Sequence, residues 1–172
     1  MSDFAGWLSQ TTLSLAIQTH AWVIPTIQSI HIVAIGVVLA SLWMIVLRVL
    51  GWAGPDQTLM ETTGRFGPWL SGALWVLLVT GALMVIGEPA RELLALSFWL
   101  KMGLIVVGTT VAVAFQLALR KDEQRWETSL VHRASTKLLA VLTMLIWVGI
   151  VILGRLIAYD HVWGAWSLSP TT

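Results

Sequence analysis

The sequence contains no cysteine and few charged residues. The absence of cysteine excludes disulfide bonds, iron–sulfur clusters and metal sites that are built from thiolates. Charged residues make up 11% of the 172 residues, whereas a soluble globular domain has about 25%. Because hydrophobic residues make up 57%, we predict a single membrane domain that covers residues 1–172.

Motifs of soluble enzyme chemistry are also missing. The sequence has no glycine-rich nucleotide motif, no nucleophile elbow and no H-E-x-x-H zinc motif. The formal net charge of +1 indicates no large basic surface for nucleic acid. We therefore expect an electron-transfer or structural subunit in the lipid bilayer in preference to a stand-alone enzyme.

Four apolar stretches are long enough to cross a bilayer, for which about 20 residues are needed. They cover approximately residues 22–47, 66–86, 98–119 and 134–158. This pattern predicts an all-α fold, namely an integral membrane four-helix bundle.

The segments outside the spans predict three further features. Residues 4–18 are short and mildly amphipathic, which favours an interfacial helix before the first span. Residues 51–65 are polar and predict a loop. Residues 88–97 predict a short surface helix that Pro89 starts.

Lysine and arginine are distributed unequally between the two sides of the predicted bundle. The loops between spans one and two and between spans three and four hold Arg48, Arg65, Arg120, Lys121, Arg125, Arg133 and Lys137. The opposite side holds Arg91, Lys101 and Arg155. The positive-inside rule then predicts that both termini lie on the outer, periplasmic side of a bacterial inner membrane.

His31 is the main candidate for a functional residue, because a titratable side chain in a spanning helix usually has a function. It lies nine residues past Trp22, about 13 Å along the helix axis. Gln28, one turn away, is the expected partner for its ring N–H. One interpretation is an axial ligand of haem b, and the other is a hydrogen bond between helices.

Two further histidines are expected at the outer surface. His20 precedes the first span, and His161 follows the last. They lie at similar depth, so they are alternative or additional haem ligands, or metal ligands that bind copper or zinc with Asp160. The alternative interpretation is that each histidine is a polar residue at the membrane interface and binds no ligand.

Three other side chains in the outer half of the bundle are candidates for cofactor binding. Arg155 lies in the last turn of span four, where its guanidinium suits a haem propionate or pairs with Glu88. Met84 and Met102 lie near the depth of His31, so either is a candidate sixth ligand of the iron. Methionine in a helix bundle also serves as packing filler.

Distinctive motifs are distributed over nearly the whole chain. They are S-I-H-x-V-A-I-G in span one, L-R-V-L-G at 47–51, T-G at 80–81, F-W-L-K at 98–101 and W-V-G-I-V-I-L-G-R-L-I-A-Y at 147–159. This pattern resembles an uncharacterised family of small bacterial four-span membrane proteins, which implies the fold and no established activity. The first motif also looks like the membrane domain of the copper-resistance family. The likeness to b-type cytochrome subunits is looser, because spans two and three lack histidine.

Three hypotheses on function follow. The first is a b-type cytochrome-like subunit that holds haem near the outer face and passes electrons between quinone and a periplasmic acceptor. The second is a non-catalytic subunit that packs with other membrane subunits or with its own copies, as in a respiratory or photosynthetic complex. The third is a copper-handling protein that uses His20, Asp160 and His161.

Overall fold

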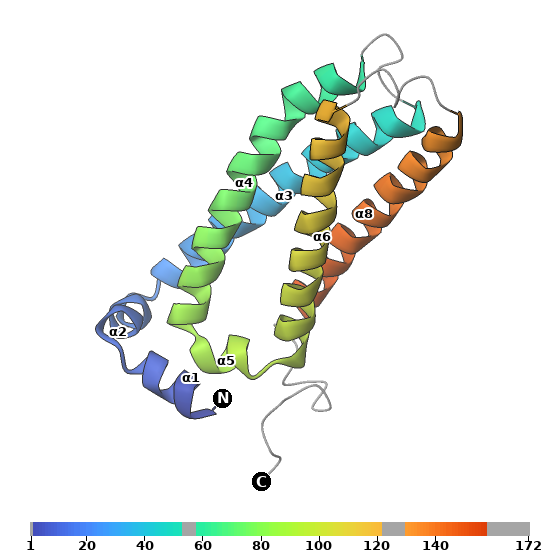
Figure 1. Cartoon of the computed structure of the whole chain (residues 1–172). Helices are drawn as coiled ribbons and strands as arrows, with labels where there is room; N and C mark the ends of the chain where they lie inside the picture. Colours follow the sequence, from blue (N-terminus) through green and yellow to red (C-terminus); the bar gives the residue numbers. More distant parts are fainter. Residues whose placement is uncertain (1, 53–57, 122–129, 158–172) are drawn as a thin grey trace.

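The computed structural model describes residues 2–52, 58–121 and 130–157 (Figure 1). These residues form seven helices: α1 Ser2–Ser9, α2 Thr12–Thr19, α3 Val23–Leu50, α4 Leu59–Gly87, α5 Pro89–Leu93, α6 Leu96–Lys121 and α8 Leu130–Ile157. Within this part of the chain, α3, α4, α6 and α8 are long and apolar enough to cross a membrane. The predicted all-α four-helix membrane bundle is confirmed.

The four long helices pack as two pairs. α3 packs along α4, α6 packs along α8, and α3 also contacts α8. In the described ranges α4 and α6 make few contacts with each other, and Figure 1 shows α5 bridging the end of α4 and the start of α6. The buried core joins α3, α4 and α8 through Val38, Leu42, Leu70, Ala73, Trp147 and Ile150.

The segment before the first span forms two short helices, where the sequence analysis predicted one over residues 4–18. The break lies at Thr11, whose side chain accepts a hydrogen bond from the Ser14 N–H at 3.4 Å and caps α2. A threonine side chain at an N-cap satisfies an N–H that the helix leaves unpaired. Exposed Phe4 and Trp7 stack on α1, which fits a helix at a membrane interface.

α1 and α2 cover the end of the bundle at which α5 lies. The Ser14 hydroxyl donates a hydrogen bond of 2.6 Å to the Ile86 carbonyl, near the end of α4. α1 packs on α5 through a buried cluster of Ala5, Leu93, Ala95 and Phe98. α5 begins at Pro89 as predicted. Its Ala90 and Arg91 are exposed, and α1 covers the face that carries Leu93.

The loop between α3 and α4 is shorter than predicted. α3 ends at Gly51, which adopts a left-handed conformation with φ 80°. α4 begins at Leu59, well before the predicted start at residue 66, because Thr58 and Glu61 form a capping box. Each of these two side chains binds the backbone N–H of the other residue, which stabilises the first turn. The predicted loop over residues 51–65 therefore includes two turns of helix.

Candidate functional site

His31 lies on α3 with its ring turned towards α4. Its Nδ1 is 2.7 Å from the Thr80 hydroxyl oxygen, and Thr80 is 6% exposed. The position at which Gly81 would carry a β-carbon is 3.7 Å from His31 Cε1. Thr80 thus supplies a polar partner for the imidazole, and Gly81 lies against the edge of the ring at a distance where an alanine would make an ordinary van der Waals contact.

The hydrogen bonds of Thr80 define the tautomer of His31. The Thr80 hydroxyl donates its single hydrogen to the Val76 carbonyl at 2.6 Å, so it can only accept from His31. We infer that His31 Nδ1 carries the proton and donates it to Thr80. His31 Nε2 then holds an unshared electron pair, which can bind a metal or accept a proton.

Lys101 on α6 and Glu92 on α5 extend this site. The Lys101 charge interacts electrostatically with both His31 and Glu92. Glu92 is 6% exposed, and burial raises the pKa of its carboxyl group although the charges of Lys101 and Arg91 oppose the shift. A buried carboxyl group and a half-buried ammonium therefore lie at the same end of the bundle as His31.

The start of α6 adds an unpaired hydroxyl group. Ser97 is 2% exposed, and its Oγ has no hydrogen-bond partner among the described residues. Ser97 precedes Lys101 by one helical turn, so the two side chains lie on the same face of α6. Lys101 reaches α8, where its Nζ is 3.6 Å from the position of a β-carbon on Gly154. We name His31, Thr80, Glu92, Ser97 and Lys101 the α5-end polar cluster.

The residues that the sequence analysis placed around His31 have different roles. Thr80, in place of the expected Gln28, is the partner of the His31 ring. Met84 follows Thr80 by one turn on the same face of α4, so its position as a second ligand stays a prediction. Met102 is 39% exposed on α6, and its proposed ligation is likewise untested.

The remaining predicted ligands lie at the end of α2, in the last turn of α8, or outside the described residues. His20 is exposed at the end of α2, and its Nδ1 donates to the Ala16 carbonyl at 3.1 Å. His161 and Asp160 lie outside the described residues, so the copper hypothesis stays a prediction. Arg155 is exposed in the last turn of α8, and its role towards a propionate is also untested. No group of three or more histidine, aspartate or glutamate side chains in the described ranges could hold a metal ion.

Four members of the cluster were not predicted from the sequence, namely Thr80, Glu92, Ser97 and Lys101. Thr80 belongs to the T-G pair at 80–81, and a hydroxyl residue within a spanning stretch was the available signal. Glu92 lies on the predicted short helix over residues 88–97, and its burial follows only from the packing of α5 among its neighbouring helices. Lys101 was used only to predict the orientation of the chain in the membrane, although a lysine one turn inside a span is itself a signal of function.

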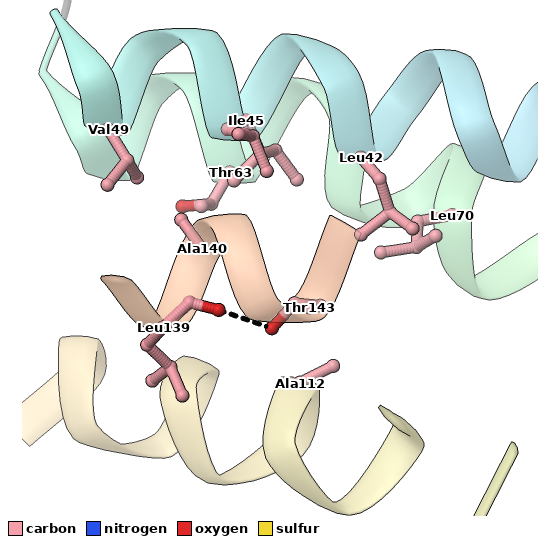
Figure 2. Close-up of a pocket in the computed structure, with 10 residues that line it drawn as sticks. Leu42, Ile45, Val49, Thr63, Leu70, Ala112, Leu139, Ala140 and Thr143 are labelled. Atoms are coloured by element: carbon pink, nitrogen blue, oxygen red, sulfur yellow. Dashed lines mark hydrogen bonds between the residues drawn. The ribbon is translucent and has the colours of Figure 1, made fainter. Parts of the chain in front are cut away.

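The opposite end of the bundle contains a small apolar cavity of about 50 Å³. Figure 2 shows that side chains from α3, α4, α6 and α8 line it. The Thr143 hydroxyl there donates to its own helix, at the Leu139 carbonyl, at 2.8 Å. The volume of this cavity is large enough for a few water molecules and too small for an organic cofactor.

A second, larger hollow lies on the outside of the α3–α4 pair. This α3–α4 groove has a volume of about 680 Å³ and is lined by residues that include Ser29, Ala34, Gly72 and Ala73. A β-carbon added to Gly72 would meet no atom within 4 Å. The groove is therefore open along helices that are apolar enough to face lipid.

Comparison with known proteins agrees with the predicted resemblance to an uncharacterised family. No curated protein and no solved structure matches the chain. The match to a protein family covers residues 4–160, and thus nearly the whole bundle. The chain belongs to DUF6644, a family of unknown function.

Proposed function

We propose that this protein is a b-type cytochrome-like membrane subunit in which His31 Nε2 is an axial ligand of haem iron. The observation that carries the proposal is the pair of hydrogen bonds of Thr80, one to His31 Nδ1 and one to the Val76 carbonyl. Histidines that ligate metals almost always donate their other ring N–H to a fixed acceptor, which sets the tautomer and the ring orientation. His31 has this arrangement.

The hydrogen bond between helices that the sequence analysis offered as the alternative is present at Nδ1. It satisfies one ring nitrogen only, and in the described residues Nε2 has no hydrogen-bond partner. A histidine that served packing alone would gain nothing from a free Nε2 in an apolar span, because an unpaired polar atom there costs free energy. This difference supports the ligand hypothesis.

The rest of the chain would supply binding and orientation. Haem would supply one-electron redox chemistry. Thr80 would hold the imidazole in place, and Met84 or Met102 would be a second ligand of the iron. Electrons would pass between quinone and a periplasmic acceptor. The lysine and arginine distribution supports a position of the α5 end on the outer side of a bacterial inner membrane.

An absorption spectrum tests this proposal. The protein is expressed with haem supply, purified in detergent and compared with His31→Ala and His20→Ala variants. We expect Soret absorbance in the wild type and in His20→Ala, whose replaced residue is exposed and bonds the backbone of α2. We expect its loss in His31→Ala. Equal Soret absorbance in all three proteins would refute ligation by His31.

A second candidate is a non-catalytic subunit that packs in a larger membrane complex or with its own copies. The open α3–α4 groove favours it, because small residues on a spanning helix allow another helix to approach closely. Replacement of Gly72 by leucine would fill the groove, and Gly103→Leu on α6 is the matched control, since neither glycine has a neighbour within 4 Å. This function would be supported if partners co-purify with the wild type and with Gly103→Leu from native membranes, and if Gly72→Leu abolishes this co-purification. Recovery of the isolated protein only would count against it.

A further inference from the structure

The α3–α4 groove combines a small-residue lining with bulky apolar side chains. Ala34 and Ala73 line it and are buried. Val33 and Trp69 line it as well, and they are 67% and 68% exposed. The groove therefore offers apolar contacts on the outside of the helix pair, where a hydrocarbon chain can lie.

One end of the groove lies next to an arginine on the same face of α4. Arg65 precedes Trp69 by four residues and Gly72 by seven, which is the spacing of one helix face. Four residues of helix rise by about 6 Å. Figure 1 shows that the start of α4 lies at the end of the bundle opposite α5, which the lysine and arginine distribution predicts to be cytoplasmic. The apolar groove thus continues into a positive charge at the predicted inner surface.

The Arg65 guanidinium is available to bind an anion. Arg65 is exposed, and its Cζ lies 5.6 Å from the centroid of the Phe66 ring. It forms no ion pair among the residues that the structure describes. Glu61, one turn earlier, instead accepts a hydrogen bond of 2.8 Å from the Thr58 N–H. A guanidinium forms two parallel hydrogen bonds to a phosphate group, which is therefore the anion it suits best.

The shape of the groove favours a slender chain over a neighbouring helix. A helix is about 10–12 Å wide with its side chains, and it needs small residues at the interface to approach closely. Ile30, Val33 and Trp69 are bulky, line the groove and stay exposed. A flexible acyl chain adapts to such an uneven surface. The volume of about 680 Å³ also falls within the roughly 300–1,000 Å³ of sites that bind small organic molecules.

We propose that the α3–α4 groove binds an acyl chain of an anionic phospholipid whose phosphate group binds Arg65. Trp69 would lie between the two, at the membrane interface where tryptophan is enriched. Basic pockets between spanning helices are one way in which membrane proteins recognise anionic head groups. This inference is independent of haem, and it assigns to the groove a lipid in place of the neighbouring helix of the second candidate function.

Native mass spectrometry of the delipidated protein in detergent tests the inference, because it counts bound lipids and protein copies in one measurement. The protein is titrated with palmitoyl-oleoyl phosphatidylglycerol. Diacylglycerol with the same chains lacks the phosphate, and phosphatidylcholine carries a cationic choline beside it. We expect one tightly bound phosphatidylglycerol per protein and weaker binding of the other two lipids.

Arg65→Met should weaken phosphatidylglycerol binding about tenfold or more, as expected for the loss of a charge-assisted contact. It should leave diacylglycerol binding unchanged. Gly72→Leu should weaken the binding of both lipids, because its side chain would fill the groove. Two controls should bind both lipids as the wild type does. Arg91→Met removes a positive charge that pairs with Glu88 at the other end of the bundle, and Gly103→Leu adds a leucine to α6.

Three results would overturn the inference. The first is equal binding of phosphatidylglycerol by wild type and Arg65→Met, and the second is equal binding by wild type and Gly72→Leu. The third is a dimer of the delipidated protein that Gly72→Leu dissociates, which would show that a second copy occupies the groove. Circular dichroism checks the fold of each variant. If Gly72→Leu does not fold, Val33→Trp replaces it, since Val33 lines the same groove at an exposed position.

Discussion

Replacement of Thr80 by valine removes the hydroxyl that accepts from His31 and keeps the shape of the side chain. Thr80 is buried, and its oxygen is 2.7 Å from His31 Nδ1. Valine leaves the Nδ1–H without an acceptor in an apolar span, which costs about 1–3 kcal/mol of stability. Loss of such a partner typically lowers metal affinity by about 10–100-fold. We expect both effects in Thr80→Val.

The assay combines thermal unfolding in detergent with haem titration. Nitrogen NMR of histidine-labelled protein adds the tautomer, with the His31 signal assigned by its loss in His31→Ala among the four histidines of the chain. Wild type should show a proton on Nδ1, and Thr80→Val a mixture of tautomers. Thr80→Ser, which keeps the hydroxyl, should remain close to wild type in all three measurements.

Thr143→Val provides the matched control at the other end of the bundle. Thr143 is also buried, but its hydroxyl bonds only the Leu139 carbonyl of its own helix. Its replacement should leave haem affinity unchanged. A folded Thr80→Val protein that binds haem as tightly as wild type would refute the claim that Thr80 presents Nε2 to the iron.

Two further predictions concern the α5 end of the bundle. Gly87→Ala should destabilise the protein by about 1–3 kcal/mol in thermal unfolding, because the new β-carbon would lie 2.6 Å from Ile24 Cδ1 and 2.9 Å from Ile17 Cγ2. The control Gly64→Ala should not destabilise the protein, because its new β-carbon would have nothing within 4 Å. Equal effects of the two substitutions on stability would contradict this packing around Gly87. Burial raises the pKa of Glu92 above its usual 4.5, so the folded state holds this proton more tightly than the unfolded state, and this group lowers stability as pH rises from about 4.5 through the raised pKa. Glu92→Gln should remove this decrease, and an unchanged pH profile of unfolding would show that Glu92 is not buried.

The sequence was sufficient to predict the four spans because length and apolarity alone determine them. The ends of the elements were predicted less well, although local signals existed. Thr58 and Glu61 form a capping box whose S/T-x-x-E pattern is visible in the sequence. Thr11 likewise caps α2. The helix ends were predicted from the hydropathy pattern, and hydropathy carries no information about capping residues.

The candidate site could be predicted only in part, for a physical reason. His31 stands out because one imidazole in an apolar span is unusual. Its contact with Thr80 depends on the rotation of α3 relative to α4, and helices that are apolar on all sides give no periodic signal of which face is buried. The burial of Glu92 depends on the packing of α5 against α1, α4 and α6, and α1 is distant in the sequence. Lys101 lies near the start of α6, which α5 connects to the end of α4 (Figure 1).

The central claim is that His31 Nε2 holds haem iron at the α5 end of the bundle. The most direct test is the visible absorption spectrum of the detergent-purified protein, recorded oxidised and after reduction with dithionite. We expect a Soret band that shifts on reduction and is absent from the His31→Ala variant. A wild-type protein that is folded, was expressed with haem supply and shows no Soret band would contradict it.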